Sequence, residues 1–429
     1  MHSRDLLISG GRLVDPEADE LRRADLLIRD GKVVALSPNI NADVPVLDAT
    51  GLIVSPGFID LHVHFREPGQ EWKEDIDSGS RCAAAGGFTT VCAMPNTDPP
   101  LHDQESVRFV VERAREVGLV DLHVVGAVTT DLAGTILSPM GEMAAAGCVA
   151  FSDDGRPILD SGLMRRALEY SRQFYLPIVQ HAEDTGLTRG GAMNESAIST
   201  KLGLTGMHSS AEEIVVARDL ALLPLTGGRY HVAHTSCART IELLRRARAE
   251  GLPVSCEVTP HHLALDEQAV SDCDYDANYK MNPPLRSVVD REAMIQGCVD
   301  GTIDAIATDH APHLPDEKEI GFSAAPFGVI GLETAFSVAA TTLLPHMSLR
   351  DLLRLLTTGP ASVFGFKDRG RLAPGLRGDV VLFDSESEAV YSVESTHSKS
   401  RNSAFDGMRL QGKIVATVLE GRVVFGESR

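Results

Sequence analysis

The stretch "FIDLHVHFREPG", residues 58–69, places two histidines two positions apart in an apolar run. Residues i and i+2 of a β-strand point to the same face, so His62 and His64 are expected to project side by side, with Asp60 and Arg66 in the same register. Polar side chains on a buried strand cost free energy unless they find a partner. Because neutral imidazole is the commonest protein ligand of metal ions, the spacing predicts a metal site.

Further polar residues end the apolar runs that follow along the chain. They are Asn96, Asp153, Asp154, His181, His234, Asp309 and His310, with His313 just beyond. A set of four histidines and two aspartates suits a borderline-soft divalent ion such as zinc. Six ligands exceed one tetrahedral site, and they fit two metals that share a bridging carboxylate, an arrangement used for hydrolysis.

The elements that must position these residues alternate in type. Apolar, β-branched runs are separated by amphipathic segments, which predict helices at 103–117, 161–174, 238–250 and 288–300. Ser209, three residues before Glu212, predicts a capping box at the start of another helix. The runs lie at 58–65, 88–96, 121–130, 147–154, 176–184, 230–236, 252–260 and 303–312. Eight strands that alternate with helices predict a parallel, closed (β/α)8 barrel, whose strand ends meet on one face.

Both ends of the chain have a different pattern. Short apolar runs split by Gly-Gly and Asp-Gly pairs are typical of hairpins, and they lack helical periodicity. We predict an α/β protein with two domains. Residues 56–365 are expected to form a metal-dependent catalytic domain with a TIM-like barrel. Residues 1–55 and 366–429 are expected to form a small β-sandwich domain. The stretch 310–331 is rich in Pro, Gly and Ala and predicts a long loop, a candidate lid.

Composition narrows the class of protein. The formal net charge of −20 argues against nucleic acid or an anionic membrane as a partner. The seven cysteines form no CxxC pair and are expected to be free thiols in a reducing compartment. No apolar run reaches the length of a membrane span and no signal peptide is recognisable, so a soluble, cytoplasmic protein is expected.

Several motifs in order resemble a known family. "DLHVHFREPG", "AMPNT", "FSDDG", "QHAED", "HVAHTS", "MNPPLR" and "ATDHAPH" are similar to motifs of the amidohydrolase superfamily and, within it, of the dihydroorotases of the bacterial class I type. The similarity covers nearly the whole chain. It implies reversible, zinc-dependent hydrolysis of L-dihydroorotate to N-carbamoyl-L-aspartate, the cyclisation being a step of pyrimidine synthesis.

The resemblance also implies residue roles. One zinc would be held by His62, His64, Asp154 and Asp309, and a second by Asp154, His181 and His234. Many relatives bridge the metals with a carbamylated lysine, but "GCVAFSDDG" has none, so Asp154 is assigned as the bridge, with Asp153 as the alternative and one or two metals per subunit left open. Asp309 would be the catalytic acid and base. Substrate contacts would be His64, Arg66, Asn96, Asn282, His313 and the backbone at Phe327 and Gly328.

Other readings stay open at this point. An allantoinase or hydantoinase would act on a cyclic amide without a carboxylate, and an inactive homologue would only scaffold aspartate transcarbamoylase. The expected partner is a small-molecule substrate; a homodimer and an association with aspartate transcarbamoylase are further candidates. Asp60, His261 and His262 are candidates for positions behind the metal ligands.

Overall fold

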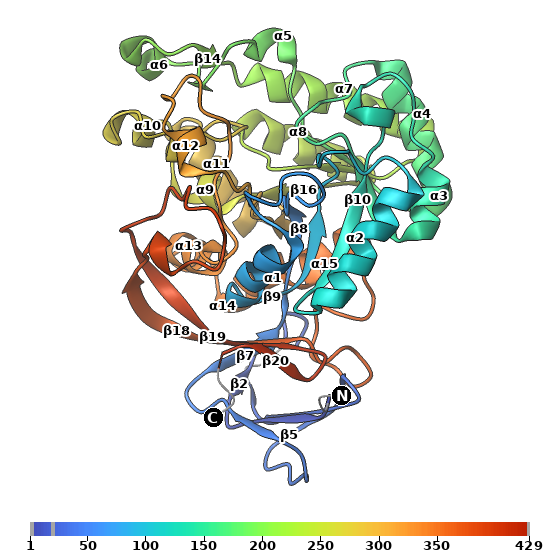
Figure 1. Cartoon of the computed structure of the whole chain (residues 1–429), viewed down its shortest axis with the longest axis vertical. Coiled ribbons are helices and arrows are strands. Elements are labelled where there is room, and N and C mark those ends of the chain that lie inside the picture. The colour runs from blue at the N-terminus through green and yellow to red at the C-terminus, as the bar shows by residue number, and fades with distance from the viewer. Residues whose placement is uncertain (1–3, 19–21, 427–429) are drawn as a thin grey trace.

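Eight parallel strands form the central barrel (Figure 1). The computed structural model describes residues 4–18 and 22–426, so parts of the predicted terminal domain, at 1–3, 19–21 and 427–429, lie outside it. A parallel bridge between Val63 and His310 closes the ring. The (β/α)8 prediction is confirmed, with strands β8 (Phe58–Val63), β9 (Phe88–Ala93), β10 (Asp121–Gly126), β11 (Cys148–Ser152), β12 (Ile178–Gln180), β15 (Tyr230–Val232), β16 (Val254–Val258) and β17 (Ala305–Ile306) in spatial order.

Helices surround this barrel, and their ends follow from local sequence. Asp103 begins α2 by accepting a hydrogen bond from the Ser106 N–H at 2.8 Å, and Gly118, with φ of 60°, ends it. The four predicted helices are present as α2 (Gln104–Val117), α4 (Ser161–Ser171, extended by a 3-10 turn to Phe174), α8 (Ala238–Ala249) and α11 (Val288–Val299). Others are α1 (Ile76–Ala85), α3 (Met140–Ala146), α13 (Ala335–Leu343), α14 (Leu349–Leu356) and α15 (Thr358–Phe364).

The predicted capping box is wrong, although the helix α7 (Ser210–Thr226) is present. Ser209 has helical backbone angles and makes no side-chain cap hydrogen bond. Glu212 is buried and accepts hydrogen bonds from the N–H groups of Ser236 and Cys237, each at 3.2 Å. Glu212 bonds these N–H groups instead of the start of its own helix, because N–H groups at the start of α8 have no partner within α8.

A second, all-β unit lies beside one end of the barrel (Figure 1). One sheet joins β5 (Lys32–Ser37), β4 (Asp25–Arg29), β1 (Leu6–Ser9) and β6 (Val46–Asp48). The other joins β20 (Arg422–Phe425), β19 (Arg409–Leu419), β18 (Val380–Val390), β7 (Ile53–Pro56), β2 (Arg12–Leu13) and β3 (Arg22–Arg23). Residues from both chain ends therefore share one sheet.

Strand β18 connects the two units. Val380 and Leu382 pack into the core between the two terminal sheets, whereas Val381 and Phe383 pack into the core of the barrel. Successive side chains of a strand point to opposite faces, so one strand can serve both cores. Phe383 contacts Phe336 of α13, with ring centroids 4.5 Å apart.

Candidate metal and substrate site

The six predicted metal ligands gather at the carboxyl ends of five barrel strands. His62 lies in β8 and His64 follows it, whereas the other four lie within three residues of the ends of β11, β12, β15 and β17. Parallel strands place these ends on one face, which is where barrel enzymes carry their chemistry. Each of the six side chains belongs to a residue that is at most 9% exposed: His62, His64, Asp154, His181, His234 and Asp309.

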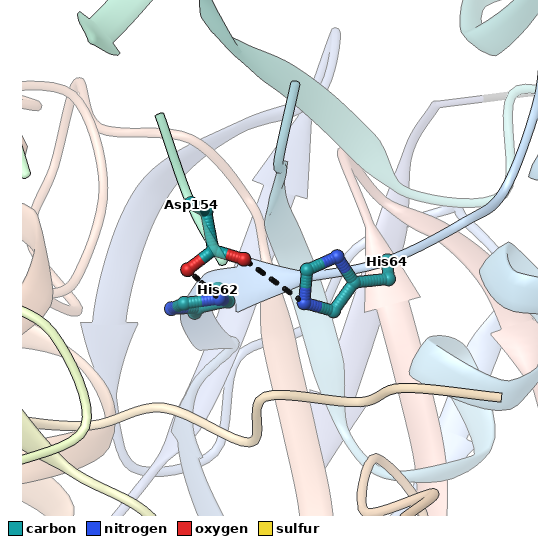
Figure 2. A group of neighbouring side chains, drawn as sticks. All are labelled: His62, His64 and Asp154. Carbon is teal, nitrogen blue, oxygen red and sulfur yellow. Dashed lines mark ion pairs between the residues drawn. The ribbon is translucent and has the colours of Figure 1, made fainter. Parts of the chain in front are cut away.

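Asp154 lies between the two histidines of the HxH pair (Figure 2). Its Oδ1 is 3.4 Å from Nε2 of His62, and its Oδ2 is 3.6 Å from Nε2 of His64. Both ring nitrogens thus face the same carboxylate, one on each oxygen. This is the same-face projection that the i, i+2 spacing predicts.

A second pair of histidines lies near Oδ1 of the same carboxylate. His181 Nδ1 is 3.8 Å and His234 Nε2 is 3.7 Å from Oδ1 of Asp154. The two ring nitrogens are 2.9 Å from each other. Glu183 Oε2 lies 3.0 Å from Nε2 of His181, so the ring of His181 is held with Nδ1 toward Asp154.

Asp309 lies beside the two histidines of the HxH pair. Its Oδ1 is 3.0 Å from Nε2 of His64 and 3.5 Å from Nε2 of His62. Burial alone would raise the pKa of Asp309, but the neighbouring imidazoles of His62 and His64 outweigh it and hold the pKa below the usual range. Burial alone would lower the pKa of His62, but the carboxylates of Asp154 and Asp309 outweigh it and hold the pKa well above 6.5.

The donor set fits one or more metal ions. Ligand atoms of His62, His64 and Asp154, and likewise of Asp154, His181 and His234, lie within 4.8 Å of one another. His62 Nε2 and Asp154 Oδ1 are buried and make no hydrogen bond within the part of the chain that the structure describes. Buried polar atoms normally have partners, so two unpaired atoms that face each other point to a shared cation. Imidazole and carboxylate donors suit zinc and similar divalent ions.

A cavity of about 370 Å³ opens onto this cluster. All seven predicted substrate contacts line it: His64, Arg66, Asn96, Asn282, His313, Phe327 and Gly328. Arg66 carries the positive charge, since burial lowers its pKa only to about 10. Its Nη2 lies 3.5 Å from Nε2 of His313 and its Nε donates to the Pro312 carbonyl at 3.4 Å.

The two asparagines among the predicted substrate contacts have side-chain partners in the protein. Asn96 lies between two predicted ligands, with Oδ1 2.9 Å from His64 Nδ1 and Nδ2 donating to Asp154 Oδ2 at 3.2 Å. Asn282 donates from Nδ2 to Glu183 Oε2 at 2.9 Å. Asn96 therefore orients two residues of the metal cluster, whereas Asn282 contacts Glu183, which in turn lies beside His181.

Asp153, the alternative to Asp154, points elsewhere. It accepts a hydrogen bond from the Thr129 N–H at 2.9 Å and a second from the Thr129 hydroxyl. Burial raises its pKa to about 6. Between the two neighbouring aspartates, the geometry brings Asp154 to the histidines.

Asp60 lies behind the metal ligands, where it contacts the backbone of His62 and not its ring. Its carboxylate accepts from the N–H groups of His62 and Thr308, each at 3.1 Å, and from the Thr308 hydroxyl at 2.6 Å. Its pKa is raised to about 7, chiefly by burial. Asp60 thus fastens β8 to the chain just after β17.

Glu257 holds the ring of His62. Its Oε1 lies 3.1 Å from Nδ1 of His62, and its Oε2 lies 3.2 Å from Nε2 of His231. Sequence reasoning missed this glutamate. The available signal was a charged residue inside the apolar run "LPVSCEVTP". Glu183 was missed in the same way, within "QHAED".

The histidines after β16 have separate surroundings. His262 lies 2.7 Å from the Thr259 hydroxyl and 3.0 Å from the Pro283 carbonyl oxygen, so it ties this strand end to the loop of Asn282. His261 is buried, and burial lowers its pKa to about 4. Neither residue belongs to the two clusters of metal-ligating atoms found among the described residues.

The predicted lid is a long segment that two lysines fasten. It contains one short helix, α12 (Pro315–Lys318). Lys318 donates to the carbonyl oxygens of Ala277 and Pro326 at 3.0 and 2.8 Å, and Lys280 donates to those of Ser323 and Ala325 at 2.9 and 2.7 Å. The segment thus borders the cavity in a defined conformation.

Comparisons with known proteins agree with this geometry. A family model described as "Dihydro-orotase-like" matches residues 51–240, and an amidohydrolase family model matches residues 331–425. The chain is 48% identical to the dihydroorotase of Solibacter usitatus over 97% of both proteins. It is 45% identical to that of Citrifermentans bemidjiense over 98% of this chain and 99% of the relative.

Solved structures show the same fold. The L-hydantoinase (dihydropyrimidinase) of Arthrobacter aurescens superposes with a TM-score of 0.87 at 27% identity, over 99% of this chain and 97% of the other. The dihydropyrimidinase of Brevibacillus agri gives 0.86 at 24% identity, over 99% and 96%, and at this identity shows the fold alone. Within the described residues, no helix combines the length and the apolar character needed to cross a bilayer. By its near full-length similarity, the chain belongs to the dihydroorotase family of cyclic amide hydrolases.

Proposed function

We propose that the chain catalyses the reversible hydrolysis of L-dihydroorotate to N-carbamoyl-L-aspartate, with ring closure as the direction used in pyrimidine synthesis. Family membership supports the reaction class. One observation supports the substrate: the cationic side chain of Arg66 lines the same cavity as the histidine and aspartate cluster. Dihydroorotate needs both features, because it is a cyclic amide that also carries a carboxylate.

The proposed cofactor is zinc, with two ions per subunit that share Asp154. His62, His64, Asp154 and Asp309 would hold one ion, and Asp154, His181 and His234 would hold the other. The two overlapping groups of ligand atoms support this division. When bound, such ions supply Lewis acidity, which polarises the amide carbonyl and lowers the pKa of water.

Asp309 is proposed as the acid and base. It accepts a proton from the attacking water and passes it to the ring nitrogen as the C–N bond breaks. Its place beside His62 and His64, together with its position on the cavity wall, supports this role. Ring closure uses the same carboxylate in the opposite order.

Arg66 is proposed to bind the substrate carboxylate, since a guanidinium pairs with a carboxylate through two parallel hydrogen bonds. Asn96, His64 and His313 line the cavity around it and are assigned to the same end of the substrate. Asn282 and the backbone at Phe327 and Gly328 are assigned to the polar atoms of the ring.

The test combines metal analysis with a substrate panel. Purified protein is assayed on dihydroorotate, hydantoin and allantoin, and its zinc content is measured by elemental analysis. Turnover of dihydroorotate, with kcat/KM reduced at least about tenfold in Arg66→Met, is expected. Turnover of hydantoin or allantoin but not dihydroorotate would overturn the substrate assignment.

A cytoplasmic location, a homodimer and an association with aspartate transcarbamoylase remain parts of the proposal. Retention of all six predicted metal ligands supports a catalyst rather than an inactive scaffold. Size-exclusion chromatography of the chain, alone and mixed with the transcarbamoylase, checks both assemblies. Separate elution at micromolar concentration would count against the complex.

A further inference from the structure

Asn402 lies against the segment that borders the cavity, although it belongs to the C-terminal part of the chain. It precedes β19 and is only 3% exposed. The segment from Ala311 to Ile330 carries three of the proposed substrate contacts, namely His313, Phe327 and Gly328. Asn402 itself does not appear on the cavity wall.

Four hydrogen bonds join Asn402 to the two ends of this segment. At the first end, Nδ2 donates to the Ala311 carbonyl at 2.9 Å, and Oδ1 accepts from the His313 N–H at 3.0 Å. At the second end, Nδ2 donates to the Gly328 carbonyl at 3.1 Å, and the backbone carbonyl accepts from the Ile330 N–H at 2.9 Å. One buried amide therefore uses both donors and its acceptor across the neck of the loop.

The two ends approach closely enough for one side chain to reach both. Gly328 has φ of 125°, and a Cβ at this position would lie 2.6 Å from the Cβ of Ala311. Only glycine allows this contact with that backbone conformation. His313 Nε2 also lies 2.9 Å from the Phe327 carbonyl oxygen, which makes a second link across the neck.

The chain around Asn402 is anchored to the barrel. Ser398 and the Lys399 N–H donate to Glu74, and the Ser400 hydroxyl donates to the Lys73 carbonyl at 2.9 Å. Glu74 Oε2 lies 3.3 Å from Nε2 of His310, directly after Asp309. The chain just before Asn402 is thus bonded, through Glu74, to His310, which directly follows Asp309.

We propose that Asn402 is a positioning residue for substrate binding: it sets His313 and the Phe327–Gly328 backbone at a fixed distance from Arg66. The inference rests on the proposed function for the identity of the substrate. Asn402 does not touch the substrate, so its effect reaches the reaction through the loop. Its loss leaves the metal cluster intact and weakens contacts made equally in the ground and transition states, which raises KM more than it lowers kcat.

The test compares Asn402→Ala and Asn402→Asp with the wild type. Both variants are expected to retain wild-type metal content and to raise KM for dihydroorotate about tenfold or more, with a smaller change in kcat. In Asn402→Asp, the new carboxylate still accepts a hydrogen bond from the His313 N–H. It has no N–H group to donate to the carbonyl oxygens of Ala311 and Gly328. Wild-type KM in Asn402→Asp would therefore overturn the proposal.

Asn194→Ala is the matched control. Asn194 is also a buried asparagine, bonded to Glu267 and Arg286, and it does not line the cavity. A general loss of stability lowers the active fraction, and hence the apparent kcat, without changing KM. The same KM increase in the control would overturn the proposal.

Hydrogen exchange separates this inference from the proposed function. Peptides covering 311–330 are expected to exchange faster in Asn402→Ala than in the wild type or in Asn194→Ala, whichever cyclic amide the enzyme prefers. Unchanged exchange there would overturn the inference on its own. Faster exchange with an unchanged KM for the preferred substrate would overturn the positioning role of Asn402. Inactivity of the wild-type enzyme on dihydroorotate would count against the proposed function only.

Discussion

Three residues of the site have backbone angles that residues other than glycine rarely adopt. Arg66, His234 and Asp309 have φ of 60°, 33° and 49°. Such left-handed conformations cost of order 1 kcal/mol or more for residues other than glycine, and they persist where the surroundings determine them. Here each one follows a strand end and turns a functional side chain toward the cavity.

Replacing Asp309 by asparagine tests the proton-transfer role at the scale of one oxygen atom. Asp309→Asn keeps the shape but removes the basic oxygen, so kcat is expected to fall by about 10² to 10⁴-fold with the fold retained. Steady-state kinetics and the melting temperature measure the two effects. The control is Asp379→Asn, which changes a buried aspartate of the β-unit. Near-normal turnover in Asp309→Asn would show that Asp309 is not the acid and base.

His313 makes a prediction about pH. Burial, assisted by the cations of Arg66, Lys318 and Lys73, lowers its pKa from 6.5 to about 2. The unfolded chain binds a proton here below pH 6.5 and the folded chain does not, so this histidine lowers stability as the pH falls from about 6.5 toward 2. The free energy of unfolding in urea should therefore fall less between pH 7.5 and 5.0 in His313→Gln than in the wild type.

The exposed His346 provides the matched substitution, His346→Gln. It should keep the wild-type dependence of stability on pH over the same interval. Equal slopes for wild type and His313→Gln would mean that folding does not change the pKa of His313.

At the scale of elements, sequence patterns predicted the strands well and their ends less well. Every predicted run contains a barrel strand, but the last run, 303–312, contains only Ala305–Ile306. The polar residues that follow leave the strand ladder, as the φ of Asp309 shows. Period and composition detect burial, whereas this turn is set by neighbours that pack across the barrel.

The same limit explains which supporting residues the sequence did not predict. Asp60 was expected behind a histidine because it lies in register with His62, and it contacts the backbone N–H of that residue, whereas Glu257, from β16 two strands away around the barrel, holds the ring. Ser209 and Glu212 have the right spacing for a capping box, yet a partner in the next helix takes Glu212. Local spacing cannot reveal which distant N–H or ring nitrogen will compete.

Strand β16 carries a testable support of the metal cluster. Because Glu257 holds Nδ1 of His62, Glu257→Ala should weaken metal affinity by about 10 to 100-fold through loss of ring orientation. Competition with a chelator of known affinity measures the change. Glu267→Ala removes a mostly buried glutamate bonded to Asn194 instead and should leave metal affinity unchanged; equal loss in both would refute the specific role of Glu257.

At the scale of the whole molecule, metal removal should affect stability as well as activity. Ligands that bind only the folded state stabilise it by mass action, about 2.7 kcal/mol at a free concentration one hundred times Kd. Dialysis against a chelator is therefore expected to abolish turnover and lower the melting temperature, and added zinc should restore both. Full activity in protein shown by elemental analysis to be metal-free would refute the metal assignment.

The fold and the six clustered residues were accessible from sequence because their signals are local: HxH, strand-end carboxylates and eight alternating runs. The contacts of Asn402 were not, since "SRNSAF" has no periodicity and its partners lie between Ala311 and Ile330. Nothing in the spacing of two segments reveals that they meet. Only tertiary packing brings them together.

The pairing of β7 with β18, through Val54 and Leu382, has a consequence for how the protein is made. Strand β7 leaves the ribosome long before its partner β18 is translated. Its edge therefore stays unpaired while the barrel is being synthesised. The nascent chain therefore cannot complete its domains in order from the N-terminus. Translation that stops before the last strands leaves a sheet with unpaired strand edges, which can pair with other chains. Premature termination is therefore expected to cause aggregation as well as loss of activity.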